Sequence, residues 1–390
     1  MTVREALRGM DEGSYFKAFY FLYFAAWSGF VVFRNAYFED LGMTGAEMGT
    51  IGFLLRTAGI LALPAWGLLG DRYGAQKTIL LASVVASGAL GAIYPRAASV
   101  FPLLALVSVA FAAFRAPVKP VANAMVLSTG VPYGTVRAYG SIAFGVAALG
   151  LGLASSRVGT VVVFYGFGVG MAVLAAILLR IPVENRPPTE SVGLRAVSLV
   201  RNRNFAALVV AAFLMGAMFP AGSAYLSVLV RSLGGTDAVT GLSVAAKTAG
   251  EAVVFLYAAR FATTYRRLLV VGAGCHVLTF AFYATAPPPA FVVGAQLFLG
   301  VGYAAFMLAA VNLAAELAPV SLGSTAQTFL TGFGFAAGAA LGELASGRLL
   351  DLVGVQSMYQ YVAAVGLVVV AVTGLVDGSL GTGPLLPADD

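Results

Sequence analysis

Charged residues are scarce in this sequence. Asp, Glu, Lys and Arg make up 10% of the 390 residues, whereas hydrophobic residues make up 60%. A soluble domain averages about 25% charged residues, so this chain could not cover a water-facing surface of ordinary size. The shortage of charge excludes an ordinary soluble protein and indicates that lipid surrounds most of the chain.

Cysteine and histidine are almost absent as well. The single cysteine, Cys275, excludes an intramolecular disulfide, and the single histidine, His276, stands next to it. Adjacent residues point to different sides of a helix and no third ligand is near in sequence, so the two do not predict a metal site. The sequence also contains no hydrolase, kinase or P-loop motif. We therefore expect no enzymatic activity, no metal and no cofactor.

Long apolar runs predict about twelve transmembrane helices, since one helical span needs roughly 20 apolar residues. A polar, Arg-rich stretch at 182–203 separates the runs into two sets of six. We therefore predict an N-terminal six-helix bundle at 1–181, a cytoplasmic linker at 182–203 and a C-terminal six-helix bundle at 204–390. The expected spans lie roughly at 15–38, 46–69, 78–95, 100–128, 137–157, 160–181, 205–232, 238–259, 267–286, 290–316, 323–347 and 357–377.

The basic residues do not form the contiguous patch that a nucleic-acid-binding protein needs, although the formal net charge is +6. In this span assignment, thirteen Lys and Arg fall in segments on the side that holds both chain ends, and four fall on the other side. Cytoplasmic loops are enriched in Lys and Arg. We therefore predict a multi-pass protein of the plasma membrane with both termini in the cytoplasm and no nucleic-acid partner.

The two halves also resemble each other weakly. The segment AALG at 147–150 recurs at 339–342, which is 192 residues later, and Lys77 and Arg267 are 190 residues apart. Two similar offsets near half the chain length favour duplicated halves, with chance similarity between helices rich in Ala, Gly and Leu as the alternative. Parallel repeats of this kind place a substrate site at their interface, near the bilayer midplane.

The segment between the second and third expected spans carries a specific pattern. Residues 67–77 read GLLGDRYGAQK, which resembles the loop signature of the major facilitator superfamily, Gly-x-x-x-Asp-Arg-x-Gly followed by basic residues. The resemblance implies that this loop helps to gate the cytoplasmic side. The residues that carry it are Gly67, Asp71, Arg72, Gly74 and Lys77.

Four further segments, at 64–67, 116–124, 136–145 and 324–327, are similar to the branch of this superfamily that contains lactose permease, nucleoside–proton symporters and phenylpropionate-type permeases. The likeness implies an all-α membrane protein with twelve transmembrane helices in two pseudo-symmetric six-helix bundles. It also implies secondary active transport of a small-molecule substrate with protons, by a monomer in the lipid bilayer. Asn123 stands where the branch often has an acid, so the resemblance alone does not establish proton coupling.

Basic residues inside the expected spans mark the candidate substrate site, because a mid-span Lys or Arg costs about 2.5–3.5 kcal/mol on the insertion scale. Arg115, Lys119 and Asn123 recur every four residues and therefore share one helix face. Arg34 and Arg56 fall near uncertain span ends, where snorkelling or lipid binding is the alternative. The full set is Arg34, Arg56, Arg115, Lys119, Arg137 and Lys247.

The fifth expected span presents a second group on one face. Arg137, Ser141 and Phe144 stand at i, i+4 and i+7, and the resemblance to nucleoside symporters implies that these three contribute to the substrate site. Trp27 in the first span and Tyr303 in the tenth are further candidates for substrate binding. Packing or interfacial anchoring is the alternative for each aromatic residue.

Lys247 and Glu251 stand at i, i+4 on the eighth expected span and could pair directly. Related transporters often have a functional acid on this helix, so the resemblance implies that the two residues couple transport to protons, with Glu251 as the carrier. Glu251 is the clear acid deep in a span, since Glu316 and Glu343 fall near expected span ends. A static structural ion pair is the alternative.

The excess of positive charge inside the expected spans favours an organic anion, such as a carboxylate or phosphate ester, because Arg can bind these groups bidentately. Our first hypothesis is therefore proton-coupled symport of a small organic anion. The second is symport of a neutral nucleoside or sugar, which Asn123 and the branch resemblance favour. The third is a transport-dead sensor or scaffold, against which the retained loop signature argues.

Overall fold

The computed structural model describes residues 12–73, 75–128, 133–180, 199, 201–257, 265–319 and 322–376, and over these residues the chain is helical and contains no strand. The first half comprises α2 (Glu12–Asp40), α3 (Gly45–Tyr73), α4 (Gln76–Ala97), α5 (Phe101–Arg115), α6 (Val118–Ser128), α7 (Tyr133–Val158) and α8 (Val162–Leu178). The second half comprises α10 (Arg203–Met218), α11 (Leu226–Ser232), α12 (Asp237–Tyr257), α13 (Tyr265–Ala284), α14 (Pro289–Leu317), α15 (Gly323–Thr328), the π-helix η4 (Phe329–Ala336) and α16 (Ala337–Thr373).

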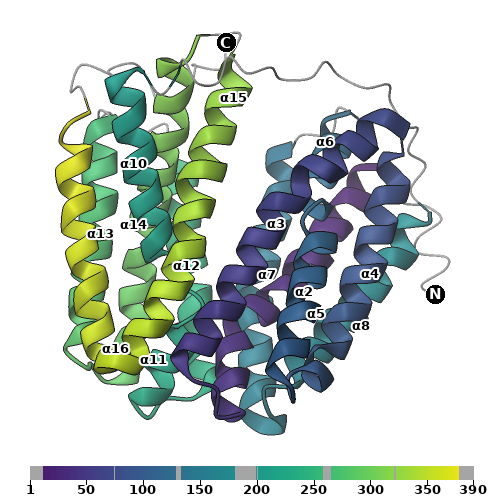
Figure 1. The fold of residues 1–390 in the computed structure, drawn as a ribbon, viewed down its shortest axis with the longest axis horizontal. Coiled ribbons are helices and arrows are strands. Elements are labelled where there is room, and N and C mark those ends of the chain that lie inside the picture. Colours follow the sequence, from purple (N-terminus) through teal and green to yellow (C-terminus); the bar gives the residue numbers. More distant parts are fainter. Residues whose placement is uncertain are drawn as a thin grey trace.

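The predicted set of twelve transmembrane helices is confirmed. Nine helical stretches of the described part of the chain are long and apolar enough to cross a bilayer, and α8 and α10 are shorter apolar helices. The last stretch contains two helices, because α16 is interrupted at Gly354, whose φ of 78° only glycine adopts readily. In Figure 1 the two parts of α16 run as separate helices joined at one end. The predicted linker falls mostly outside the described residues, so its boundaries stay predictions.

Two of the transmembrane helices are broken in the middle. α5 and α6 are separated at residues 116–117, where Pro117 and Pro120 cannot donate backbone hydrogen bonds. α10 and α11 are separated at 219–225, and the freed carbonyl groups there accept hydrogen bonds from buried side chains. Gln296 Nε2 donates to the carbonyl oxygen of Gly222 at 3.2 Å, and the Tyr359 hydroxyl donates to that of Ala221 at 2.8 Å. Broken helices of this kind mark binding sites in transporters.

The two halves meet along two seams of small residues, α3 against α16 and α7 against α12. A Cβ added at Gly45 would lie 2.4 Å from the carbonyl oxygen of Gly347, and one added at Gly152 would lie 2.5 Å from that of Asp237. These distances leave no room for a side chain, so glycine allows the helices to approach closely. We call the end of the molecule that these seams close the closed side; it includes the start of α3 and all of α11.

The halves separate toward the opposite end, which we call the linker side because α8 ends and α10 begins there. The last turns of α3 and α12 are exposed, with Leu68 at 71%, Tyr73 at 65% and Leu256 at 79% exposure. Nothing lies within 4 Å of a Cβ added at Gly67. Figure 1 shows the two groups of helices diverging toward the end that holds α6 and α15 and converging near α11. The halves therefore contact each other on the closed side and separate toward the linker side, and we call the region between them the cleft.

Candidate substrate-binding site

Arg115 lies at the break between α5 and α6 and is held by aromatic side chains of α2. Its Cζ atom is 3.8 Å from the ring centre of Trp27, and its Nη1 donates a hydrogen bond to the Tyr23 hydroxyl at 3.2 Å. The Nε atom is buried without a hydrogen-bond partner. A guanidinium stacked on an indole gains a cation–π attraction but keeps its full charge, so Arg115 still has capacity to bind an anion.

Arg137 repeats this arrangement one helix further along. Its Cζ atom lies 4.5 Å from the ring centre of Phe24, and its Nη1 donates to the Ser141 hydroxyl at 3.0 Å. Arg137 and Ser141 therefore lie on one face of α7, as their spacing predicts. Phe144, one turn further, is half-buried and packs against the hydrophobic core.

Lys119 and Asn123 complete the basic surface of the first half. Lys119 is exposed, and Arg137 and Arg115 are the charged groups near enough to act on it. Asn123 accepts a hydrogen bond from the Tyr20 hydroxyl of α2. No acidic side chain of the described residues forms an ion pair with Arg115, Lys119 or Arg137. We call these three residues the basic wall.

The second half contributes a paired cation. Lys247 Nζ lies 3.2 Å from Glu251 Oε1, the contact that their spacing predicts. Lys247 Nζ is also 5.0 Å from the ring centre of Phe219 and 4.9 Å from that of Tyr303. Glu251, Arg137 and Arg56 are all near enough for their charges to act on the Tyr303 hydroxyl. Tyr303 therefore lies where charged groups of both halves converge.

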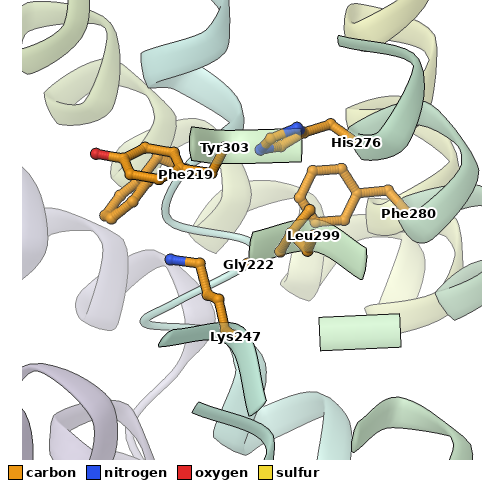
Figure 2. A pocket seen from close by; sticks show the side chains of 7 residues that line it. All are labelled: Phe219, Gly222, Lys247, His276, Phe280, Leu299 and Tyr303. Atoms are coloured by element: carbon orange, nitrogen blue, oxygen red, sulfur yellow. The ribbon is translucent and has the colours of Figure 1, made fainter. Parts of the chain in front are cut away.

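A small cavity lies beside Lys247 inside the second half, as Figure 2 shows. His276 is buried at its edge, and its Nδ1 is 2.8 Å from the carbonyl oxygen of Gly272. A carbonyl oxygen can only accept, so Nδ1 carries the proton in the neutral ring and Nε2 is left as an acceptor. The lining residues are Phe219, Gly222, Lys247, His276, Phe280, Leu299 and Tyr303. His276 thus lines this cavity, although its sequence position did not predict a role.

A buried cluster of three charges joins the halves. Glu343 Oε2 is 3.1 Å from Arg34 Nη2, and Glu343 Oε1 is 3.0 Å from Arg56 Nη2. We call these residues the charge triad. The expectation that Glu343 lies near a span end was wrong, because the helix continues beyond residue 347 to the reversal at Gly354. The predicted gap between the spans at 323–347 and 357–377 contains this reversal, but it ends the helix too early, at the charged residues Arg348 and Asp351.

The loop signature is described only in part. Arg72 and Tyr73 are exposed, with the Arg72 Cζ 5.6 Å from the Tyr73 ring centre, and Lys77 is half-buried. Gly74 and the side chain of Asp71 lie outside the described residues. The gating role of Gly67, Asp71, Arg72, Gly74 and Lys77 therefore stays a prediction.

Known proteins resemble this chain over most of its length. The maltose permease of Geobacillus stearothermophilus is 30% identical over 361 residues, covering 89% of this chain and 90% of that protein. The uncharacterized transporter YwbF of Bacillus subtilis (strain 168) is 26% identical over 356 residues, covering 88% of each protein. The crystal structure of the nucleoside transporter NupG superposes with a TM-score of 0.82 at 18% identity, covering 94% of this chain and 99% of that one.

A POT family transporter in complex with a thioalcohol-conjugated peptide is a more distant structural neighbour, with a TM-score of 0.67 at 13% identity over 93% of each chain. Likenesses at such low identity establish the fold alone. The family model described as MFS_1 like family matches residues 14–361. The chain therefore belongs to the MFS_1 like family and is a multi-pass membrane transporter of small molecules in the major facilitator superfamily.

Proposed function

We propose that this transporter is a proton-coupled symporter of a small organic anion. The observation that carries the proposal is the lack of an acidic partner for the basic wall within the described residues. Arg115, Lys119 and Arg137 contrast in this respect with Lys247, which has Glu251 beside it. Unpaired charges within the membrane-spanning part of a protein are costly, and a bound anion would compensate them.

The geometry of the basic wall supports a ligand with a carboxylate or phosphate group beside an apolar or hydroxylated body. Guanidinium groups bind such anions through paired hydrogen bonds. Trp27 and Phe24 already stack on Arg115 and Arg137, and this stacking limits the motion of both guanidinium groups. We infer that the wall binds the anionic group while Tyr303 of the opposite half contacts the remainder of the substrate.

We infer that the described state faces the cytoplasm. The halves touch on the closed side and separate on the linker side, and the excess of Lys and Arg in linker-side loops supports a cytoplasmic position for that side and for both termini. Rocking of the halves around a central site would then expose the basic wall to the two sides in turn. This mechanism is consistent with a monomer in the plasma membrane.

A neutral sugar or nucleoside is the second candidate substrate. The relative named maltose permease is 30% identical to this chain, and the structural neighbour NupG is named as a nucleoside transporter. Under this alternative the basic wall would donate hydrogen bonds to hydroxyl groups, and its charge would stay uncompensated.

A thermal-shift experiment on the purified protein in detergent separates the two candidates. The ligands are gluconate and glucose 6-phosphate as anions, with maltose and uridine as neutral counterparts. A ligand at 100 times its Kd adds about 2.7 kcal/mol to the free energy of unfolding if it binds only the folded state. We expect stabilisation by an anion that is lost in Arg137→Ala.

The matched control for this experiment is Arg348→Ala, which removes an exposed charge from the other half and should leave the stabilisation intact. Stabilisation by maltose or uridine alone would overturn the organic-anion proposal and support the neutral candidate.

A further inference from the structure

The charge triad contains one negative charge too few. Two guanidinium groups, those of Arg34 and Arg56, share the single carboxylate of Glu343. Arg34 and Glu343 are nearly inaccessible, at 4% and 1% exposure. The triad therefore carries a net charge of +1 between the halves, where an uncompensated charge is costly. One additional anion would give each guanidinium its own partner.

Arg56 is the member of the triad that such an anion can reach. Its side chain is 24% exposed, and its Cζ lies 5.7 Å from the ring centre of Phe219, the ring that also faces Lys247. Arg115 is near enough for its charge to act on Arg56, as is Arg56 on the Tyr303 hydroxyl. Arg56 thus belongs to the cleft as well as to the triad.

We propose that Arg56 is an additional anion-binding residue of the cleft, and that Glu343 from the opposite half occupies it while the cleft is empty. When an anion binds to Arg56, Glu343 keeps Arg34 as its partner, and all charges are then paired. The inference rests on the proposed function, because it requires an anionic substrate.

This exchange of partners would connect binding to movement of the halves. Arg56 belongs to α3 and Glu343 to α16, so their ion pair spans one of the two seams that close the molecule. Its loss on binding removes one of the two ion pairs that the triad forms between the halves. A ligand that weakens contacts of one state shifts the equilibrium toward the other, so the substrate itself would promote opening of the closed side.

Three single substitutions test the exchange through anion affinity. The Kd for glucose 6-phosphate is measured by the fluorescence of Trp27 in a Trp66→Phe background, which removes the second of the two tryptophans. Glu343→Gln removes the competitor, and we expect binding about tenfold tighter, a typical coupling between two sites. Arg34→Gln leaves Arg56 as the only guanidinium partner of Glu343, so Glu343 competes more strongly with the anion. Arg56→Gln removes the guanidinium that binds the anion. Both substitutions should therefore weaken binding.

The double variant Arg34→Gln/Glu343→Gln keeps the proposal testable if Glu343→Gln misfolds. It leaves only the cation of Arg56 in the triad, whereas Glu343→Gln leaves the cations of both Arg34 and Arg56 without a carboxylate. It should bind the anion more tightly than Arg34→Gln alone, because only the competitor differs between them. Equal or weaker binding by the double variant would assign the triad a purely structural role.

The proposed function and this inference fail in different ways. If an anion stabilises the protein in an Arg137-dependent manner but the triad variants do not show the expected order of affinities, the inference is overturned and the organic-anion proposal stands. If neither gluconate nor glucose 6-phosphate binds the wild type or Glu343→Gln, both are overturned.

Discussion

At the scale of single residues, substitution of the Lys247–Glu251 pair allows proton coupling to be tested separately from substrate binding. The Glu251 side chain is 24% exposed, and its carboxylate faces Lys247, whose ammonium group also lies over the rings of Phe219 and Tyr303. A carboxyl group that is alternately wet and dry can take up and release a proton as the halves move. Glu251→Gln should therefore abolish accumulation driven by a pH gradient but spare exchange of substrate in proteoliposomes.

The control for this prediction is Glu316→Gln, which changes an exposed acid near the end of α14. Accumulation by Glu251→Gln at the wild-type rate would make Lys247–Glu251 a static structural pair.

Residue-level contacts could be predicted from the sequence only where they are local. Helical spacing correctly pairs Lys247 with Glu251 and Arg137 with Ser141, because residues four apart on a helix are neighbours whatever the rest of the fold does. Arg34 and Glu343 are 309 positions apart. Their contact depends on how the two halves dock, and neither residue's local pattern contains that information.

At the scale of helices, close packing across the α7–α12 seam gives a testable contrast between two glycines of one helix. A Cβ at Gly152 would lie 2.5 Å from the carbonyl oxygen of Asp237, whereas nothing lies within 4 Å of one at Gly150. Overpacking costs about 1–3 kcal/mol, while Ala in a helix is favoured over Gly by about 0.5–1 kcal/mol. Gly152→Ala should lower the unfolding temperature in detergent, and Gly150→Ala should leave it unchanged or raise it.

Equal effects of the two substitutions would show that the seam is not tightly packed. The contrast is informative because both changes add the same methyl group to the same helix, so helix propensity alone cannot separate them.

The helix boundaries show the limits of hydropathy. Apolar runs predict every transmembrane segment, since each must match the bilayer thickness. The reversal at Gly354 falls in the predicted gap between the spans at 323–347 and 357–377. Because Arg348 and Asp351 are charged, hydropathy ends the first of these spans at 347, although the helix continues to the reversal. The breaks next to Pro117 and Pro220 had a usable signal, because proline cannot continue the hydrogen bonding of a helix.

At the scale of the whole molecule, polar contacts between the halves on the closed side hold the described state together. The backbone N–H groups of Gly45 and Ala46 donate to the two carboxylate oxygens of Asp351 at 2.6 and 2.7 Å. The backbone N–H of Ala238 donates to the Ser156 hydroxyl at 2.9 Å. Alternating access requires all of these contacts to break together, so their summed strength sets how often the closed side opens.

Arg231 donates four hydrogen bonds on the closed side. Its removal should shift the equilibrium between molecules that are closed on this side and molecules that are open. Its Nη1 donates to Asp40 at 2.6 Å and to the carbonyl oxygen of Ala36 at 3.1 Å, both in α2. Its Nε and Nη2 donate to the buried carboxylate of Asp237 at 2.9 and 3.0 Å. Arg231→Ala therefore breaks the link between halves and leaves Asp237 without its counter-charge.

A loss of about 1–3 kcal/mol in the closed state would change the ratio of closed to open molecules about 5- to 150-fold. Distances between spin labels at positions 41 and 352, introduced as cysteines in a Cys275→Ser background, report this ratio, since both positions are exposed on the closed side in opposite halves. We expect longer distances in Arg231→Ala and unchanged ones in Arg157→Ala, which removes an exposed charge on the same side. An unchanged distribution in Arg231→Ala would mean that the small-residue seams alone keep this side closed, and that the ion pairs contribute little to the equilibrium.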